Sequence, residues 1–244
     1  MKLEVKILLT PEEIAEQISR DIAFMVKDNA ENNMGTFISL SGGNTPKILF
    51  RKMSEEFNDK IQWDKVHLFW GDERCVPPDN EESNYGMTRQ YLLNNINIPE
   101  KNVHRIRGED DPEKEAARIA SEIDLIVPAA NGLARFDLNI LGLGEDGHTA
   151  SLFPGKKLKN IAAKTAGVAV HPKTGQKRIS LTLQVINNSK QNIFMVIGRK
   201  KADIIYEIMS RKDAGKHYPA GKVRAAEILK WYLDEAAASK IKMP

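Results

Sequence analysis

Short apolar runs typical of β-strands alternate with capped helical segments along the whole chain, and this alternation is the strongest constraint on its fold. The first run, residues 2–9, has a strand-like pattern. Thr10, Pro11 and Glu13 follow as the N-cap, first-turn proline and capping-box acid of a helix. We expect this helix to extend to about Lys27.

The same pattern recurs at residues 36–43, where a β-branched run ends in two glycines, and Thr45 with Pro46 repeats the helix-start signal. Further strands are predicted at residues 65–73, 102–106, 135–144, 167–170, 178–183 and 192–198. Further helices are predicted at residues 83–96, 111–127 (capped by Asp111) and 199–211. Residues 225–240 fit either one helix or a short strand followed by a helix capped at Asp234.

Strands that alternate with helices imply right-handed crossovers and a mostly parallel sheet with helices on both faces, a Rossmann-like α/β fold. No repeat or Pro/Gly/Ser-rich linker divides the sequence, so we expect one α/β domain spanning residues 1–244. Such folds bind ligands beyond the carboxyl ends of their strands, where strand order reverses. The polar motifs of this chain are predicted to lie there.

The charge balance argues against nucleic acid as a partner. The 36 Lys and Arg residues barely outnumber the 33 Asp and Glu, the formal charge is +3, and no basic stripe is interleaved with aromatic residues. Basic clusters at residues 155–160, 198–203 and 210–217 fit either solvated surface or contact with a small anion.

Cys75 is the one cysteine, so neither an internal disulfide nor a cysteine-rich metal site is possible. Glu4 and Lys6 interrupt the apolar core that a signal peptide needs, and no segment approaches membrane-spanning length. We therefore expect a cytoplasmic protein without a membrane partner. The neighbouring Val76 and prolines favour packing over a nucleophilic role for Cys75.

The glycine-rich turn at residues 41–45 is the first candidate site. Ser41, Gly42, Gly43, Asn44 and Thr45 connect a predicted strand to a helix N-terminus, whose free amides favour an anion such as phosphate. A tight turn with a good helix cap explains the same residues equally well. The turn matches neither the P-loop nor the GxGxxG pattern, and Ser41 lacks the glycine pattern of a nucleophile elbow.

Asp72, Glu73 and Arg74 lie together at the end of another predicted strand, where Asp72 and Arg74 form the second candidate site. An arginine in this position can bind a phosphate or carboxylate through two hydrogen bonds. A local salt bridge that orients the loop is the structural alternative.

The sharpest signal is the segment LNILGLGEDGHTASLFP, residues 138–154. Its glycines allow an abrupt turn, and His148 has the side chain whose unperturbed pKa lies nearest neutrality. His148 could take a proton from water, with Asp146 orienting the ring. The other histidines have no comparable sequence setting: His67, His104, His171 and His217.

Arg178 and Lys201 are further candidates for binding a phosphate. The sequence contains no HxxxH, CxxC or regularly spaced carboxylate loop, so no metal site is expected.

Five segments together resemble the 6-phosphogluconolactonases of the glucosamine-6-phosphate deaminase/6-phosphogluconolactonase family. They occur in the family's order across almost the whole chain: LSGGNTP, DERCVPPDNEESNYGM, LGLGEDGHTASLFP, RISLTL with GRKKA, and LKWYLDEAAA. The resemblance implies the Rossmann-like fold of glucosamine-6-phosphate deaminase, ribose-5-phosphate isomerase and the CoA-transferase-like proteins. It also implies hydrolysis of 6-phosphoglucono-1,5-lactone to 6-phosphogluconate in the oxidative pentose phosphate pathway, with no cofactor.

By the same resemblance, the family's water-activating histidine corresponds to His148, and its substrate-contacting aspartate and arginine correspond to Asp72 and Arg74. The glycine-rich turn corresponds to residues 41–45, with Asn44 where serine is frequent, and a role for Lys201 is implied partly by the deaminases.

The family's proline before the Trp-bearing segment is absent here, so the resemblance leaves contacts from Lys222 and Arg224 open. The sequence of one chain does not give the oligomeric state.

Two alternative functions remain open on the sequence. The first is a hexosamine-6-phosphate deaminase or isomerase, in which Asp72 would move a proton between carbons, although TASLFP differs from the deaminase segment. The second is a non-catalytic sugar-phosphate sensor. Such regulators normally carry an additional DNA-binding segment, whereas this sequence begins with its first predicted strand.

Overall fold

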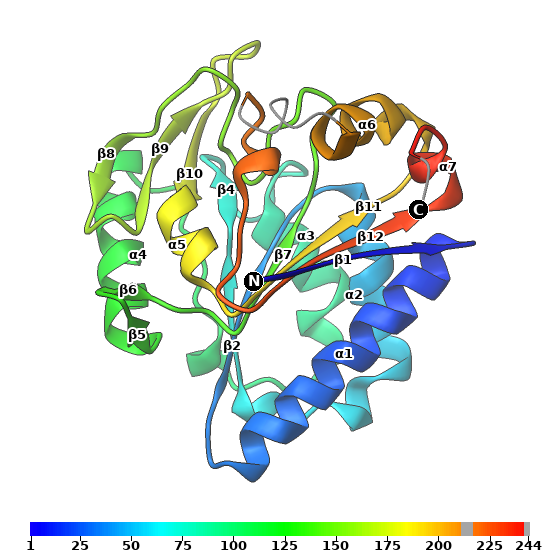
Figure 1. Cartoon of the computed structure of the whole chain (residues 1–244). Coiled ribbons are helices and arrows are strands. Elements are labelled where there is room, and N and C mark those ends of the chain that lie inside the picture. The colour runs from blue at the N-terminus through cyan, green and yellow to red at the C-terminus, as the bar shows by residue number, and fades with distance from the viewer. Residues whose placement is uncertain (211–216, 242–244) are drawn as a thin grey trace.

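A parallel sheet forms the centre of the computed structural model, which describes residues 1–210 and 217–241 (Figure 1). Its six strands all run parallel. In spatial order they are β1 (Lys2–Leu8), β12 (Ile228–Asp234), β11 (Gln191–Val196), β7 (Leu138–Leu141), β2 (Thr36–Leu40) and β3 (Val66–Trp70). The predicted mostly parallel α/β fold is confirmed.

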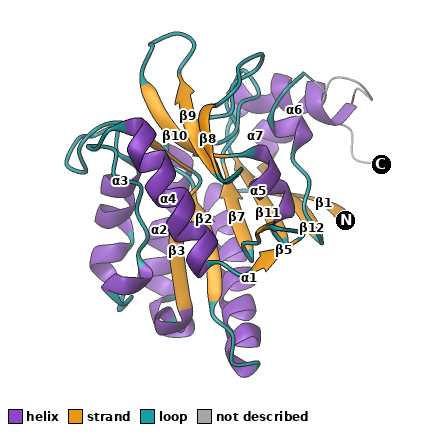
Figure 2. Ribbon diagram, turned by 90° about the vertical axis from the view of Figure 1, so that its left-hand side faces the viewer, coloured by secondary structure: helices purple, strands orange, loops and turns teal. Residues whose placement is uncertain are grey.

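A second, antiparallel sheet lies above the first in Figures 1 and 2. Its strands, in spatial order, are β4 (Asp72–Arg74), β10 (Lys177–Leu181), β9 (Ala166–Val170) and β8 (Lys159–Ala162). The two sheets meet at Gly71, whose amide donates to Leu40 O at 2.8 Å and whose carbonyl accepts from Leu181 N at 2.8 Å. A two-residue pair, β5 (Ala129–Ala130) and β6 (Leu133–Ala134), stands apart.

Helices cover the sheets on both sides (Figures 1 and 2). The helices are α1 (Pro11–Glu31), α2 (Asn44–Glu56), α3 (Asn84–Tyr91), α4 (Pro112–Ile126), α5 (Leu183–Asn188), α6 (Ala202–Ser210) and α7 (Glu235–Ala238). One apolar residue per turn of α1 is fully buried: Ile14, Ile18, Ile22 and Val26. This four-residue spacing lines one helix face and explains why α1 packs against the sheet. None of the helices within the described residues has the length and apolar character needed to cross a bilayer.

Several helix caps predicted from the sequence are confirmed. Thr10 accepts from Glu13 N at 3.2 Å, and Asp111 accepts from Lys114 N at 3.0 Å. Residues 225–240 adopt the second predicted form, strand β12 followed by α7, with Asp234 accepting from Ala237 N at 2.7 Å.

Other boundaries differ from the predictions. The first helix continues past Lys27 to Glu31. The second begins at Asn44, ahead of Thr45, because Gly43 serves as its N-cap with φ of 100° and without a side-chain hydrogen bond. The predicted strand at 102–106 is wrong, since this segment makes only an isolated bridge between Val103 and Leu68. A single bridge provides too few backbone hydrogen bonds to add this segment to the sheet as a strand.

The strands predicted at 167–170 and 178–183 exist, but they belong to the antiparallel sheet rather than the parallel one. The helix predicted at 199–211 begins as a single 3₁₀ turn, Arg199–Lys201, before α6. Its last residue, Arg211, lies outside the described residues, as does most of the basic cluster at 210–217.

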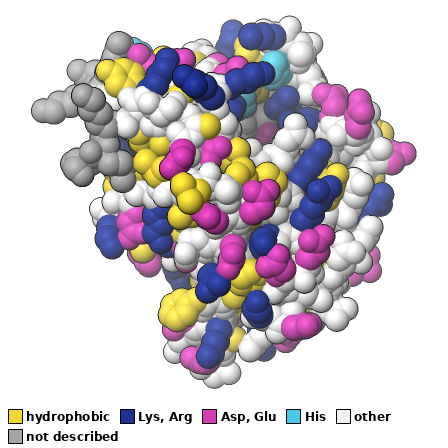
Figure 3. Space-filling model, turned by 90° about the vertical axis from the view of Figure 1, so that its right-hand side faces the viewer, with side chains coloured by type: hydrophobic (Ala, Val, Ile, Leu, Met, Phe, Trp, Pro, Cys, Tyr) yellow, Lys and Arg dark blue, Asp and Glu magenta, His cyan; other side chains and the backbone are white. Residues whose placement is uncertain are grey.

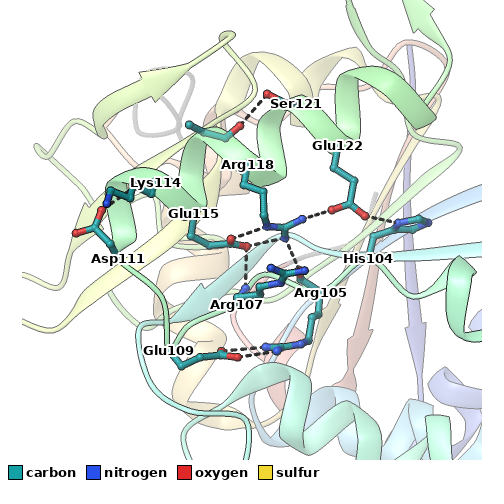
Figure 4. Close-up of polar contacts among 11 residues, drawn as sticks. His104, Arg105, Arg107, Glu109, Asp111, Lys114, Glu115, Arg118, Ser121 and Glu122 are labelled. Carbon is teal, nitrogen blue, oxygen red and sulfur yellow. Dashed lines mark hydrogen bonds and ion pairs between the residues drawn. The ribbon is translucent and has the colours of Figure 1, made fainter.

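A network centred on Arg118 holds α4 to the neighbouring loop (Figure 4). Arg118 donates to the buried Glu115 carboxylate at 2.6 Å and to Arg105 O at 2.9 Å, and it also pairs with Glu122. Glu122 in turn lies 2.7 Å from His104 Nδ1. Because α4 packs against β8, β9 and β10, this network ties the loop around His104 and Arg105 to the helix that covers the antiparallel sheet.

We predict that Arg118→Met lowers the free energy of unfolding by about 1–3 kcal/mol, because the buried Glu115 carboxylate loses its charged partner. Arg20→Met is the matched control, since Arg20 forms an exposed pair with Glu16 at 2.6 Å, and such pairs contribute about 0.3–0.5 kcal/mol. Urea unfolding of both variants makes the comparison. Equal losses would show that the network around Arg118 contributes no more than a surface pair.

Candidate active site

The order of the parallel strands reverses between β2 and β7. From β2 the chain passes to β3 on one side, whereas from β7 it continues to β11 and β12 on the other. Open α/β sheets bind ligands at such a reversal point, beyond the carboxyl ends of the strands. The turn at residues 41–45 follows β2 and the segment at 142–148 follows β7, so both predicted motifs lie at the reversal point.

The turn after β7 is shaped around the side chain of His148. Gly144 N donates to His148 O at 2.8 Å, and Gly147 N donates to Gly144 O at 3.0 Å. A Cβ on Gly144 would lie 2.1 Å from His148 Nδ1 and 2.6 Å from an Asp146 carboxylate oxygen. Glycine is therefore required at position 144 for the imidazole and carboxylate to occupy their places.

His148 and Asp146 form a close pair, with Nδ1 and Oδ1 2.5 Å apart. A carboxylate can only accept, so Nδ1 carries the hydrogen and Nε2 of the neutral ring keeps a free lone pair. Burial raises the pKa of Asp146, but the charge and hydrogen bonds of His148 outweigh it and leave that pKa below its usual value. With 28% of its side chain exposed, His148 is accessible to water.

The turn after β2 supplies backbone amides rather than side chains. Gly43 adopts a φ of 100°, and a Cβ there would meet nothing within 4 Å, so this backbone faces open space. Asn44 points outward and accepts from Lys47 Nζ at 3.0 Å. Ser41 Oγ is buried and has no hydrogen-bond partner among the described residues.

Asn84 connects the glycine turn to Asp72. A Cβ on Gly42 would lie 1.6 Å from Asn84 Oδ1, so the turn packs directly against this amide. Asn84 Nδ2 donates to Asp72 O at 2.8 Å. The buried Asp72 carboxylate accepts from Ser151 Oγ at 2.6 Å. Asp72 therefore joins the glycine turn to the segment that follows His148.

Arg74 and Arg178 lie side by side. They are direct partners in the register of β4 and β10, and Asp72 is likewise the partner of Ser180. Directly opposed residues project from the same face of an antiparallel sheet. Arg74, Arg178, Asp72 and Ser180 therefore share one face.

Neither arginine has a carboxylate partner within salt-bridge distance among the described residues. A guanidinium nitrogen of Arg74 donates to Glu82 O at 2.6 Å, and its buried Nε has no partner. Arg178 Nε donates to Gln176 Oε1 at 3.3 Å. Burial, and then the charge of Arg74, lower the pKa of Arg178. Two adjacent guanidinium groups without a carboxylate salt bridge favour binding of an anion.

Phe153 contacts both His148 and Arg178. Its ring centroid lies 5.0 Å from that of His148, and the Arg178 guanidinium lies 5.8 Å from the Phe153 centroid. Seen from the side toward which β11 and β12 point in Figure 1, Lys, Arg and His side chains gather at the top of the molecule around a recess (Figure 3).

Lys201 approaches the site from the turn before α6. Burial lowers its pKa, while Glu145 and Asp146 act in the opposite direction, which places their charges near its amine. Arg224 lies in another segment, where its guanidinium donates to Gly221 O at 3.0 Å and Val223 O at 2.7 Å.

The sequence did not single out Ser151 or Phe153 as site residues, and it grouped Glu73 with Asp72 and Arg74 without a role of its own. Glu73 is buried and accepts from the amides of Asn84 at 2.7 Å and Tyr85 at 2.8 Å, which fixes the start of α3. Burial raises the pKa of Glu73 to about 7, because its effect exceeds that of these hydrogen bonds, which act to lower the pKa. Contacts between distant segments position Ser151 and Phe153, so no local sequence signal marks them.

Two further predictions concern Cys75 and metal binding. Cys75 is partly buried, and burial raises its pKa to about 11, which keeps it a thiol as its apolar neighbours suggested. Within residues 1–210 and 217–241, no three His, Cys, Asp or Glu side chains are grouped in a way that could hold a metal ion.

Residues 9–231 match the family model described as glucosamine-6-phosphate isomerases/6-phosphogluconolactonase. The chain belongs to this family. It is 44% identical over 210 residues to a 6-phosphogluconolactonase of Haemophilus influenzae, covering 84% of this chain and 87% of the relative. It is 39% identical over 234 residues to one of Aggregatibacter actinomycetemcomitans, covering 94% and 96%.

Several solved structures share this fold. A structure described as devB protein has a TM-score of 0.90 at 39% identity, over 98% of this chain and 100% of that chain. The 6-phosphogluconolactonase of Trypanosoma brucei has a TM-score of 0.85 at 25% identity, over 99% of both chains. A monomeric glucosamine-6-phosphate deaminase, at 20% identity and a TM-score of 0.81, has the same fold.

Gly144→Ala is predicted to separate His148 from Asp146, because the new methyl group would overlap both side chains. Gly142→Ala is the matched control, since a Cβ at Gly142 meets nothing within 4 Å. The hydrogen-bonded Nδ1 proton of His148, observed by NMR, should be lost in the first variant and kept in the second. Its persistence in Gly144→Ala would show that the turn does not constrain the pair.

Proposed function

We propose that this protein hydrolyses 6-phosphoglucono-1,5-lactone to 6-phosphogluconate, the reaction of the oxidative pentose phosphate pathway. Its relatives at 39–44% identity over most of the chain are 6-phosphogluconolactonases. The single structural observation that carries the proposal is the His148–Asp146 pair near two arginines that have no salt bridge among the described residues, at the reversal of strand order. This arrangement offers a general base for water next to a cationic site for a phosphate.

His148 acts as the general base in this proposal. Nε2 removes a proton from water as the water oxygen attacks C1 of the lactone. The carbonyl electrons return as the bond between C1 and the ring oxygen breaks, and the imidazolium gives its proton to that oxygen. Asp146 stabilises the imidazolium because its carboxylate already binds Nδ1 at 2.5 Å. The products are the ring-opened acid and a neutral histidine, so no covalent intermediate with the protein is needed.

Arg178, Arg74, Lys201 and the amides of residues 41–45 bind the phosphate and the polar groups of the sugar. The two arginines supply forked donors that match phosphate oxygens, and the N-terminus of α2 adds free amides and a favourable dipole. Asp72 contributes by holding other groups of the site in position. Its carboxylate holds Ser151, three residues after His148, and so fixes the imidazole relative to the arginines.

These effects are large enough for a reactive ester. General base catalysis contributes roughly 10²–10⁴-fold, and positioning of the lactone relative to the water adds to this. A six-membered lactone already has an activated carbonyl, so the residues of the site suffice without a cofactor.

We also propose that residues 1–244 act as one domain, because the site combines the carboxyl ends of β2 and β7 with one face of the antiparallel sheet. The small-molecule substrate is a sugar-phosphate lactone, as for the relatives named above. Location in the cytoplasm and the absence of nucleic-acid and membrane partners stay predictions from the sequence.

His148→Asn is predicted to lower kcat by roughly 10²–10⁴-fold, the contribution of a general base, with little change in KM. Initial rates on freshly prepared lactone, corrected for spontaneous hydrolysis, measure this. The control is 6-phosphogluconate binding by calorimetry, which the variant should retain. A variant with wild-type kcat would remove His148 from the mechanism.

Arg178→Met is predicted to reduce selectivity for the phosphorylated lactone. The ratio of kcat/KM for 6-phosphogluconolactone to that for gluconolactone should fall about 10- to 100-fold, because a charged hydrogen bond contributes about 1.5–3 kcal/mol. Arg20→Met, on the exposed surface of α1, should leave the ratio unchanged. Equal losses on both lactones would place the phosphate away from Arg178.

A further inference from the structure

His171 occupies the same face of the antiparallel sheet as the two arginines. Its amide donates to Gln176 O at 2.9 Å, which continues the pairing of β9 with β10 by one step beyond Val170 and Lys177. In this register His171 lies opposite Gln176, and Arg178 lies two residues further along the same strand. Alternation along the strands therefore places the His171 and Arg178 side chains on one face.

The Phe153 ring connects His171 to the site described above. The centroids of Phe153 and His171 lie 5.1 Å apart in an edge-to-face arrangement, and those of Phe153 and His148 lie 5.0 Å apart. The Arg178 guanidinium also lies over Phe153, at 5.8 Å. His148, Arg178 and His171 therefore surround one aromatic side chain, and a ligand that extends from His148 to Arg178 passes close to His171.

The hydrogen bonds of His171 fix which nitrogen carries its proton. Nδ1 lies 3.1 Å from the amide nitrogen of Thr174 and 3.4 Å from that of Lys173. A backbone amide can only donate, so Nδ1 is an acceptor and the hydrogen of the neutral ring is on Nε2. The hairpin turn thus orients the ring with Nε2–H as a donor, and no described residue accepts from it.

The neutral form of His171 is favoured by its surroundings. Burial lowers its pKa, and the positive charge of Arg178 acts in the same direction, as does His148 when it carries a second proton. The charged groups near the ring are Arg178, His148, Lys173 and Asp146, and only Asp146 acts the other way. A neutral donor beside the Arg178 guanidinium suits an oxygen of an anion that this guanidinium holds.

We propose that His171 is a specificity-determining residue whose Nε2–H donates a hydrogen bond to a phosphate oxygen of the substrate held by Arg178. This inference rests on the proposed function, and it adds a neutral donor to the cationic groups already assigned to the phosphate. The hairpin that joins β9 and β10 supports this role, since the amides of Lys173 and Thr174 bind Nδ1 and keep the hydrogen of His171 on Nε2.

Two substitutions at position 171 separate substrate binding from support of the turn. His171→Asn keeps an acceptor oxygen close to the position of Nδ1 for the Thr174 and Lys173 amides but removes the distal donor. His171→Gln places an amide nitrogen close to the position of Nε2 but removes the proximal acceptor. A role in substrate binding predicts that Asn is the harmful change, whereas a role limited to the turn predicts that Gln is.

Steady-state kinetics on two lactones provide the test. In His171→Asn, KM for 6-phosphogluconolactone should rise about tenfold, as expected for loss of one hydrogen bond to a charged group, with kcat nearly unchanged. Gluconolactone, which lacks the phosphate, should be hydrolysed as by the wild type. His171→Gln should recover most of the loss, and thermal unfolding of both variants should show that they remain folded.

Binding of 6-phosphogluconate by calorimetry separates this inference from the proposed function. If the wild-type protein fails to hydrolyse the lactone, the proposed function is wrong, and the dissociation constants of the two variants still decide the role of His171. A wild-type KM and dissociation constant in His171→Asn would overturn the inference. So would equal losses on both lactones, or a larger loss in His171→Gln than in His171→Asn.

Discussion

The hydrogen bond from Ser151 to the buried Asp72 carboxylate, at 2.6 Å, is the contact on which the arrangement of the site depends. Asp72 is in the antiparallel strand that also carries Arg74, whereas Ser151 belongs to the segment that leaves the parallel sheet after β7. The contact thus ties the histidine turn to the arginine face. Loss of Ser151 Oγ would cost more than the bond contributes, because the buried Asp72 carboxylate would keep only the longer hydrogen bond from Asn84 Nδ2, at 3.5 Å.

Around this contact, each part of the site is held by local backbone chemistry. Gly144 makes room for the imidazole and carboxylate, and Gly43 begins α2 without a side chain over its amides. Glu73 fixes the start of α3, and Asn84 at that helix start contacts both Gly42 and Asp72. The rigid parallel sheet brings these turns to one edge, so segments that are distant in the chain meet there.

The sequence predicts the features that depend on neighbouring residues. Caps at Thr10, Asp111 and Asp234 are recognisable because a side chain that binds an amide three residues ahead leaves a local signature. His148 and Asp146 can be paired for the same reason, since they lie two positions apart in the chain. Thr45 is misleading as a cap because Gly43, with its positive φ, begins the helix earlier.

Features that depend on long-range packing are not predictable in this way. Ser151, Phe153 and His171 have ordinary local surroundings and gain their roles only when the antiparallel sheet forms against the histidine turn. Whether residues 167–170 and 178–183 join the parallel sheet or a separate one is equally beyond a local pattern. A short strand has the same sequence pattern in either sheet. Its packing against neighbouring strands, which the local sequence does not show, determines which sheet it joins.

A crystal structure of the protein with 6-phosphogluconate would test the central claim most directly, because the product carries both the phosphate and the carboxylate formed from the lactone carbonyl. We expect the C1 carboxylate within hydrogen-bonding distance of His148 Nε2 and the phosphate against Arg178 and the turn at residues 41–45. A product bound with its carboxylate remote from His148, or with its phosphate away from this face, would contradict the account.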